Sequence, residues 1–213
     1  MKLITISLAQ VREVEHQNKP VKTGIYKAPA PGTHRVTSMG LDGDVQIDRE
    51  NHGGVDKAVY AYTAENYRFW EEELGRPLPP GQFGENFLVS GMADDAVHIG
   101  DVFRIGALRF QVTQPRVPCF KLGIKMDDPQ FVRRFHHSGR VGFYLRVLEE
   151  GMVQAGDTIE CLETDPHHLT IQDAMLALTK GPRQQDIIRQ ALSIPALSQA
   201  WRLSLQKRLE GQD

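Results

Sequence analysis

The sequence has only two cysteines, Cys119 and Cys161, and they do not form a CxxC pair. This scarcity excludes a disulfide scaffold. It also argues against a four-cysteine zinc site and a cysteine-ligated iron–sulfur cluster. Because disulfides accumulate mainly in oxidising compartments, the same scarcity predicts a cytoplasmic protein.

Long apolar runs and an excess of one charge are also missing. No segment approaches the roughly 18 apolar residues of a membrane-spanning helix. The N-terminal apolar stretch is interrupted by Thr5 and Ser7 and becomes charged at Arg12, so no secretory signal peptide is expected. The 25 basic and 27 acidic residues give a formal net charge of −2. We therefore predict neither a nucleic-acid partner nor a membrane partner.

Several common catalytic motifs are absent. The sequence contains no GxGxxG, GxxxxGK[ST], GxSxG or HExxH motif. The segment from Asp42 to Asp48 resembles a calcium-binding loop only superficially. Gln46, Ile47 and Gly53 stand where such a loop needs a ligand, a turn glycine and a bidentate glutamate.

The composition is that of an ordinary globular chain, with 40% hydrophobic and 24% charged residues. Short apolar runs near glycine and proline predict a mainly β domain over residues 1–165, built as a barrel or a sandwich. The predicted strands cover residues 3–8, 24–26, 87–89, 102–105, 108–113, 143–148 and 158–162, with a hairpin turn at Gly106. Two helices are predicted within this domain, at residues 64–74 and 128–138.

The pattern changes to helical spacing after residue 165. Thr170 and Asp173 have the arrangement of a capping box, and apolar residues then recur at helical intervals. Further helices are predicted at residues 184–193 and 196–209, which gives a small three-helix domain over residues 166–213. Its apolar faces are expected to pack on each other or on the β domain rather than to form a docking surface.

Two glycine-rich segments contain residues that could bind a ligand. The first, at residues 40–57, combines the adjacent pair Gly53 and Gly54 with the basic residues Arg49, His52 and Lys57. Adjacent glycines allow close approach of the backbone, and basic donors suit a phosphate. A solvated glycine-rich hairpin is the competing interpretation, which these residues alone favour. The second segment, at residues 81–86, is either part of a ligand pocket or a structural turn closed by its asparagine.

A third segment presents Cys119 in a proline-rich loop. Pro115 and Pro118 stiffen this loop, and Arg116 and Lys121 place positive charge near the thiol. Neighbouring cations favour the thiolate, which is the nucleophilic and metal-binding form of cysteine. An inert buried thiol is the alternative, and the residues alone leave the two balanced. Cys161 alternates with Ile159 along a predicted strand, so it is interpreted as a small core residue.

Taken in order, these segments resemble the MOSC domain, named from the C-terminal part of molybdenum-cofactor sulfurases, and most closely its bacterial YiiM subfamily. The motifs that carry the resemblance are TGIYKAP (23–29), GLDGD (40–44), HGGVDKAV (52–59), GQFGEN (81–86), IGD (99–101), PRVPC (115–119) and AGD (155–157). Each motif is weak alone, but the ordered set is specific. The tail resembles the three-helix extension of this subfamily.

The resemblance implies a MOSC β-barrel, similar to the small barrel domain of pyruvate kinase, with helical insertions. It also implies a bound molybdenum–pterin cofactor, with Cys119 at the position of the family's molybdenum-ligating cysteine. A soft thiolate suits that metal. The residues expected to bind the cofactor are Lys27, Arg49, His52, Gly53, Gly54, Lys57, Gly84, Glu85, Asn86 and Arg116. Assigning the basic ones to the pterin phosphate is an inference from their chemistry.

The relatives implied by the resemblance are reductases of N-hydroxylated compounds. In bacteria this implies detoxification of N-hydroxylated base analogues such as hydroxylaminopurine, with removal of the N–O oxygen as water. The sequence has no nicotinamide-binding motif and too few cysteines for its own iron–sulfur cluster. We therefore expect an external electron-transfer reductase as a partner, besides the small-molecule substrate.

Three other functions remain open at this point. The first is a non-catalytic carrier of the molybdenum cofactor or of sulfur that uses Cys119. The second is a cofactor-free thiol protein in which Cys119 forms a sulfenic acid or a persulfide. The third is a plain phosphate-binding or interaction module. The sequence does not indicate the oligomeric state.

Overall fold

The β-structure is divided among three sheets in the computed structural model, which describes residues 1–47, 53–179 and 181–211. The strands are β1 (Lys2–Ala9), β2 (Arg12–His16), β3 (Lys19–Thr23), β4 (Lys27–Pro29), β5 (Thr33–Thr37), β6 (Gly40–Leu41), β7 (Val59–Thr63), β8 (Phe87–Ser90), β9 (Val102–Ile105), β10 (Leu108–Pro115), β11 (Phe143–Glu149), β12 (Gly151–Gln154) and β13 (Ile159–Glu163). The largest sheet has the order β13-β9-β10-β11-β7-β8-β1-β4. The strands β12-β5-β6 form a second sheet, and β2 and β3 form a hairpin.

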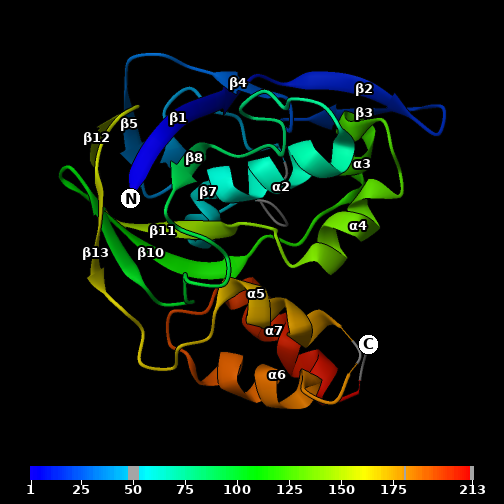
Figure 1. Ribbon diagram of the computed structural model, residues 1–213, viewed down its shortest axis with the longest axis vertical. Helices are drawn as coiled ribbons and strands as arrows, with labels where there is room; N and C mark the ends of the chain where they lie inside the picture. Colours follow the sequence, from blue (N-terminus) through cyan, green and yellow to red (C-terminus); the bar gives the residue numbers. More distant parts are fainter. Residues whose placement is uncertain (48–52, 180, 212–213) are drawn as a thin grey trace.

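The helices are inserted between strands or gathered at the C-terminus. They are η1 (Val55–Lys57), α2 (Ala64–Leu74), α3 (Phe120–Met126), α4 (Phe131–Ser138), α5 (Ile171–Ala174), η2 (Met175–Leu178), α6 (Gln184–Ser193) and α7 (Gln199–Leu209). Figure 1 shows α5, α6 and α7 as a layer below the β-rich part. Among the described residues, none of the helices combines the length and apolar character needed to span a lipid bilayer.

The large sheet is mixed and curls around its core. Its described strand pairs are antiparallel except β7 with β8, which run parallel and are connected through α2. At the start of β1, Lys2 forms an isolated bridge with Thr158, and the Leu3 amide donates to the Asp157 carbonyl at 2.9 Å. The expected mainly β fold with helical insertions and C-terminal helices is therefore confirmed. Within the described chain, β1 and the segment before β13 meet through this bridge rather than through a continuous strand pair.

Aromatic packing fixes α2 and α4 against one face of β7. Phe83 is fully buried, and its ring lies 4.5 Å from Tyr62, 5.0 Å from Tyr67 and 5.6 Å from Phe135, measured between centroids. The indole N–H of Trp70 donates to the Tyr62 hydroxyl at 2.8 Å. The core is thus dominated by large rings, and Tyr62 keeps its polar atom hydrogen-bonded inside it.

Local capping signals place several elements where the sequence predicts them. The Thr63 hydroxyl accepts from the Asn66 amide, and Gly75 ends α2 in the left-handed conformation, so the helix at residues 64–74 is confirmed. The Thr170 hydroxyl likewise accepts from the Asp173 amide at 2.9 Å. The hairpin around Gly106 is confirmed as β9 and β10.

Residues 24–26, predicted as a strand, form none. β3 ends at Thr23 and β4 begins at Lys27, and between them the Lys27 amide donates to the Ile25 carbonyl at 3.0 Å. Gly24 lies so close to Val45 that a Cβ atom would stand 2.6 Å from its carbonyl oxygen. The backbone therefore turns at this point, and the apolar side chains pack without a strand ladder.

The predicted helices at residues 128–138 and 196–209 begin later than expected. Two oxygens of Asp128 accept from the amides of Gln130 and Phe131, which makes a turn before α4. The last helix begins after Ser198, whose hydroxyl accepts from the Trp201 amide at 3.1 Å. The Ser198 hydroxyl cap sets the start of α7, whereas α4 starts after the turn at Asp128 without a side-chain cap.

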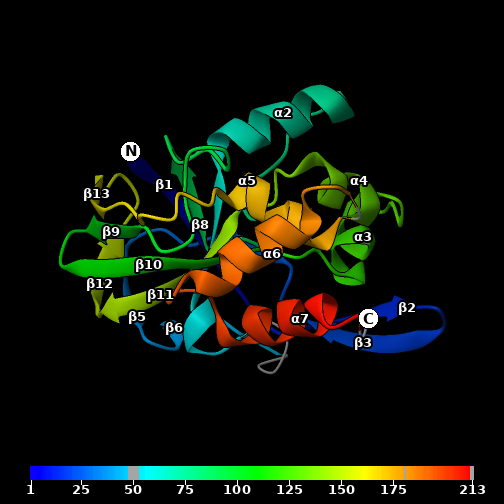
Figure 2. The same cartoon turned by 90° about the horizontal axis from the view of Figure 1, so that it is seen from below.

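The interpretation of Cys161 as a core residue is wrong. Ile159 on β13 is buried, whereas Cys161 is exposed. β13 lies at the edge of the sheet, and its pairing with β9 is irregular between Cys161 and Glu163. Strand alternation therefore does not bury this thiol. Figure 2 shows β13 at the margin of the molecule, away from the helical layer.

We expect Phe83→Ala to lower the free energy of unfolding by about 3–5 kcal/mol, because it removes a ring at the centre of the aromatic core. Denaturant unfolding measures the loss. Leu203→Ala is the matched control: Leu203 is 50% exposed, so its replacement should change the stability by less than about 0.5 kcal/mol. Equal losses from both variants would contradict this assignment of the core.

Candidate functional site

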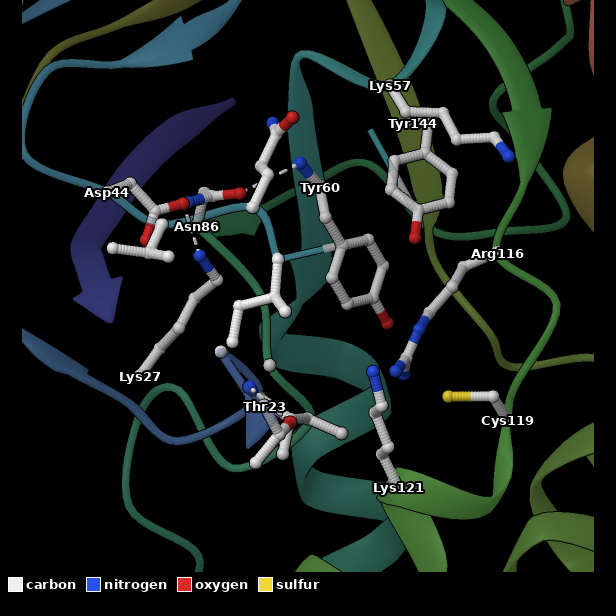
Figure 3. Close-up of a pocket in the computed structure, with 16 residues that line it drawn as sticks. Thr23, Lys27, Asp44, Lys57, Tyr60, Asn86, Arg116, Cys119, Lys121 and Tyr144 are labelled. Atoms are coloured by element: carbon white, nitrogen blue, oxygen red, sulfur yellow. Dashed lines mark hydrogen bonds and ion pairs between the residues drawn. The ribbon is translucent and has the colours of Figure 1, made fainter. Parts of the chain in front are cut away.

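A single cavity collects residues from distant parts of the chain. Its volume is about 630 Å³ including the space open to solvent. Figure 3 shows the residues that line it. They are Thr23, Gly24, Ile25, Lys27, Asp44, Val45, Gln46, Ile47, Lys57, Tyr60, Gly84, Asn86, Arg116, Cys119, Lys121 and Tyr144.

Arg116 is the most deeply buried cation of this cavity. It is only 5% exposed, and its guanidinium lies 4.8 Å from the centre of the Tyr60 ring. Burial works against the charge, but the neighbouring Tyr60, Tyr144 and Cys119 raise the pKa of Arg116 above its usual value. Its Nη1 atom has no hydrogen-bond partner among the described residues. The cavity therefore contains a permanent positive charge with an unused donor.

Cys119 stands at the start of α3, at the end of the proline-rich loop. It is half-buried, and its carbonyl accepts from the Leu122 amide at 2.9 Å. The Arg116 amide donates to the Gly142 carbonyl at 3.0 Å, which fixes the first part of the same loop. In Figure 3 the Cys119 sulfur, the Arg116 guanidinium and the Lys121 ammonium point toward the same region.

Lys27 lies on the side of the cavity opposite Cys119, where it forms an ion pair (Figure 3). Its ammonium contacts Asp44, which also accepts from the Asn86 side chain at 2.8 Å and from the Ala9 amide at 2.8 Å. Burial lowers the pKa of Lys27, although Asp44 acts in the opposite direction. The single described carboxylate that lines the cavity is thus already engaged with a lysine and with two other donors.

Asn86 and Gly84 line the cavity as parts of its wall. The side-chain oxygen Oδ1 of Asn86 accepts from the Tyr60 amide at 3.2 Å. Its side-chain nitrogen donates to Asp44, so this side chain connects the segments of Tyr60 and Asp44. This is the role that the interpretation of a structural turn closed by its asparagine predicts. Gly84 has φ +81°, and a Cβ atom there would lie 2.9 Å from Ile25.

Glu85 is completely buried and does not line the cavity. Its carboxylate accepts from the Tyr67 hydroxyl at 2.5 Å and from the amides of Gly81 and Phe83 at 2.5 and 3.1 Å. Burial raises the pKa of Glu85 despite these bonds. Glu85 therefore stabilises, from inside the protein, the turn that contains Gly84 and Asn86.

Lys125 of α3 contacts the beginning of the same turn, at residues 81–86. Its ammonium donates to the Ile25 carbonyl at 2.8 Å and to the Gly81 carbonyl. Burial lowers the pKa of Lys125 to about 8. The sequence reasoning did not select this residue, and its spacing from the turn gives no signal of the contact.

The glycine-rich segment contributes Lys57 to the cavity. Lys57 lies on η1, 5.9 Å from the centre of the Tyr144 ring. Gly53 and Gly54 do not line the cavity; Gly54 precedes η1 with φ +86°. Arg49 and His52, also predicted to bind the cofactor, lie outside the described residues.

Two tyrosines of the site were missed by the sequence reasoning. Tyr60 and Tyr144 are register partners on β7 and β11 and form the apolar face beneath Arg116. The Tyr60 hydroxyl donates to the Val141 carbonyl at 2.8 Å, and burial raises the pKa of both phenols. Tyrosines in the buried run of residues 59–63 were a possible signal, but the pairing with β11 cannot be read from the sequence.

Asp94 supports Arg116 from outside the cavity. Its carboxylate accepts from the amides of Val141 and Gly142 at 3.2 and 2.6 Å and from the Asn66 side chain. Gly142 is the residue whose carbonyl binds the Arg116 amide. Burial raises the pKa of Asp94 to about 6, although its three hydrogen bonds act in the opposite direction.

Two family models match the chain. The model of the MOSC domain matches residues 48–160, and the model of the YiiM-like, 3-alpha helix domain matches residues 169–212. The first model includes Lys57, Arg116 and Cys119, and the second includes α6 and α7.

Similar proteins are found in bacteria and fungi. The uncharacterized protein YflK of Bacillus subtilis (strain 168) is 40% identical over 97% of this chain and 93% of its own length. Protein YiiM of Escherichia coli (strain K12) is 33% identical over 90% of the chain and 86% of its own length. A protein of Gibberella moniliformis named "Reductase" is 35% identical over 67% of the chain, which spans 26% of that protein. The crystal structure of YiiM from Geobacillus stearothermophilus superimposes with a TM-score of 0.82 at 33% identity, covering 98% of both chains.

Asp94 predicts a pH dependence of the stability. Its pKa is raised from the ordinary value of 3.8, so between about pH 4 and 6 the folded state binds more protons than the unfolded state. Its contribution to stability is therefore complete at low pH and is lost as the pH rises through 6. Relative to Asp94→Asn, the free energy of unfolding should fall by the order of 3 kcal/mol across this window. Urea unfolding at several pH values measures the difference, and a difference that grows with pH would contradict the raised pKa.

Proposed function

The chain belongs to the MOSC domain family and carries the YiiM-like three-helix domain, and from this premise we propose that it is a molybdenum-cofactor-dependent reductase of N-hydroxylated compounds. Its substrates in this proposal are N-hydroxylated base analogues such as hydroxylaminopurine, reduced in the cytoplasm. The association of the MOSC family with the molybdenum cofactor and the fungal relative named "Reductase" support an enzymatic role.

The observation that carries the proposal is the buried Arg116, with its unused Nη1, in the same cavity as Cys119. A buried guanidinium is costly unless an anion or other groups compensate for the lost hydration. The described lining residues contain four basic side chains and one acidic one, which is engaged with Lys27. This excess of positive charge beside a thiol fits a ligand that is both anionic and able to bind sulfur.

The molybdenum–pterin cofactor has both properties. Cys119 would bind the metal, because a thiolate is a suitable ligand for a soft ion. Arg116, Lys57 and Lys121 would hold the phosphate of the pterin through charge-assisted hydrogen bonds. Among the described residues, no group of three histidine, cysteine, aspartate or glutamate side chains could hold a metal by itself. In this proposal the remaining ligands come from the cofactor.

The protein's own contribution to this reaction is position and charge. When bound, the cofactor supplies the oxidation and reduction chemistry of N–O bond cleavage. Arg116 and the lysines orient it, and Tyr60 and Tyr144 exclude water from the guanidinium side of the cavity. The sequence contains no nicotinamide-binding motif, so the proposal includes an external electron-transfer reductase.

The first test is the molybdenum and pterin content of protein purified from a host that makes the cofactor. We expect near-stoichiometric metal in the wild type and little in Cys119→Ala, because the thiolate ligand is lost. Cys161→Ala is the matched control, since this exposed cysteine lies outside the cavity and should leave the metal content unchanged. Elemental analysis and pterin fluorescence give the two contents.

Other results of this test lead to different functions. Pterin in all variants with metal in none favours the carrier of cofactor or sulfur over the enzyme. Neither pterin nor metal in any variant, from a cofactor-replete host, would overturn the proposal in favour of a thiol protein or a phosphate-binding module.

A second prediction concerns the phosphate-binding cations. Lys121→Met should weaken retention of the pterin about tenfold, because a hydrogen bond to a charged group contributes about 1.5–3 kcal/mol. Lys22→Met is the control, since this exposed lysine of β3 lies outside the cavity. Pterin fluorescence after dialysis at increasing salt measures retention. Equal loss from both variants would contradict the placement of the phosphate beside Lys121.

A further inference from the structure

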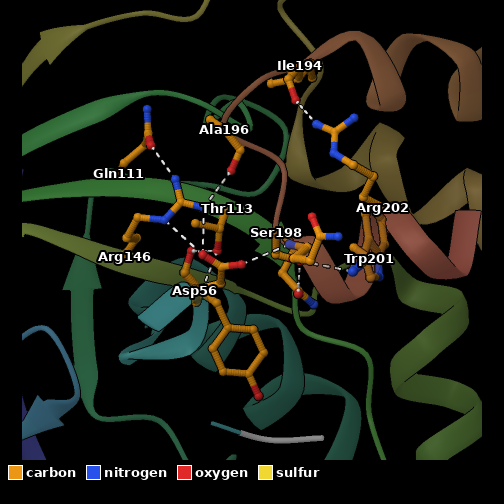
Figure 4. Close-up of polar contacts among 12 residues, drawn as sticks. Asp56, Gln111, Thr113, Arg146, Ile194, Ala196, Ser198, Trp201 and Arg202 are labelled. Atoms are coloured by element: carbon orange, nitrogen blue, oxygen red, sulfur yellow. Dashed lines mark hydrogen bonds and ion pairs between the residues drawn. The ribbon is translucent and has the colours of Figure 1, made fainter. Parts of the chain in front are cut away.

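The beginning of α7 contacts the two segments that carry Lys57 and Arg116, two of the four cations that line the cavity among the described residues. One segment is η1, on which Asp56 precedes Lys57, and the other is the end of β10, which leads into Arg116. Figure 4 shows the polar contacts at this junction. Their C-terminal partners belong to residues 194–202.

Asp56 connects η1 to α7. One of its carboxylate oxygens accepts from Arg146 at 2.6 and 2.9 Å, and the other accepts from the amide of Gln199, the first residue of α7, at 2.9 Å. Arg146 also donates to the Ala196 carbonyl at 3.4 Å. The Asp56 carbonyl in turn accepts from the Thr113 hydroxyl at 2.6 Å. η1 is therefore held to both the helical layer and β10.

Ser198 connects α7 to the end of β10. Its hydroxyl is fully buried, donates to the Gln114 side chain at 2.5 Å and accepts from the Trp201 amide at 3.1 Å. The Ser198 amide donates to the Thr113 carbonyl at 3.2 Å. The other end of the Gln114 side chain donates to the Pro115 carbonyl at 3.1 Å. The chain of contacts thus ends one residue before Arg116.

We propose that Asp56 and Ser198 are positioning residues of the cavity, through which the C-terminal helices hold Lys57 and Arg116 in place. Burial of apolar surface between the helices and the sheet is non-directional and does not fix the register of a loop. Buried hydrogen bonds are directional, and they are strengthened by the low dielectric of the interior. The helical domain is therefore part of the scaffold of the site, and this conclusion needs neither the metal nor the substrate.

Two other polar side chains of the helical layer, those of Arg202 and Thr170, have no hydrogen bond to η1 or β10 among the described residues. Arg202 donates to the carbonyls of Leu192 and Ile194, which belong to the same layer. Thr170 caps α5 by accepting from the Asp173 amide, a bond that does not involve the cavity walls. Thr170→Ala therefore removes a helix cap comparable to that of Ser198 without removing a contact to β10.

Hydrogen exchange of single amides, followed by NMR, tests the proposal on the protein without cofactor. The reporters are the amides of Arg116, bonded to Gly142, and of Lys57, bonded to Gly54. Their rates are divided by that of Ser7, a buried amide of β1 that donates to Asn86 and reports on opening of the core. We expect Ser198→Ala to raise the Arg116 ratio about tenfold. Asp56→Asn should raise the Lys57 ratio similarly.

Two controls separate positioning from general loss of stability. Thr170→Ala should leave both ratios within a factor of about two, although it removes a comparable helix cap. Ser198→Thr keeps a hydroxyl that can donate and accept, so it should restore the wild-type ratio.

Unchanged ratios in Ser198→Ala and Asp56→Asn would overturn the inference, and so would an equal rise in Thr170→Ala. If Ser198→Ala does not fold, the Lys57 ratio measured in Asp56→Asn decides whether the inference stands. The result does not depend on metal or pterin content, so it is distinct from any failure of the proposed function.

Discussion

Keeping Arg116 charged inside the protein is the constraint to which most of the site is adapted. A guanidinium with 5% exposure loses nearly all of its hydration, which costs several kcal/mol unless neighbouring groups compensate. Tyr60 and Tyr144 provide polar edges and a π-face beside it, and the Gly142 carbonyl fixes its backbone. Its Nη1 donor has no partner among the described residues, which leaves the compensation incomplete within that part of the chain. An anionic ligand would complete it, which connects the energetics of folding to the chemistry of the cavity.

The polar side chains around the cavity largely form hydrogen bonds that hold neighbouring segments of the protein in position. Asp94 and Glu85 are buried carboxylates. Their oxygens accept hydrogen bonds from backbone amides of tight turns rather than from a ligand. Asn86 and Asp44 connect strands on the wall opposite Cys119. The beginning of α7 does the same from the helical layer. Besides the Lys27–Asp44 pair, the charged and nucleophilic side chains among the described residues that line the cavity are Lys57, Arg116, Lys121 and Cys119.

Much of the fold was predictable because its signals are local. The caps of α2 and α5, the hairpin at Gly106 and the helical pattern after residue 165 each depend on residues within one turn or two. The errors have a common cause. Residues 24–26 turn because of close contact with Val45, and Cys161 is exposed because β13 is an edge strand. Neither the contact nor the edge is encoded in the neighbouring residues.

The sequence by itself determined the identity of the cysteine loop, the ordered motifs of the MOSC family and the presence of basic residues suited to a phosphate. These depend on residue type and order, which need no coordinates. Only the tertiary structure decided which residues share the cavity. It brought Lys27, Lys57, Arg116, Cys119 and Lys121 together, added Tyr60 and Tyr144, and placed Glu85 in the core instead. The physical reason is that strand pairing and burial join residues far apart in the chain, as β7 with β11 does for the two tyrosines.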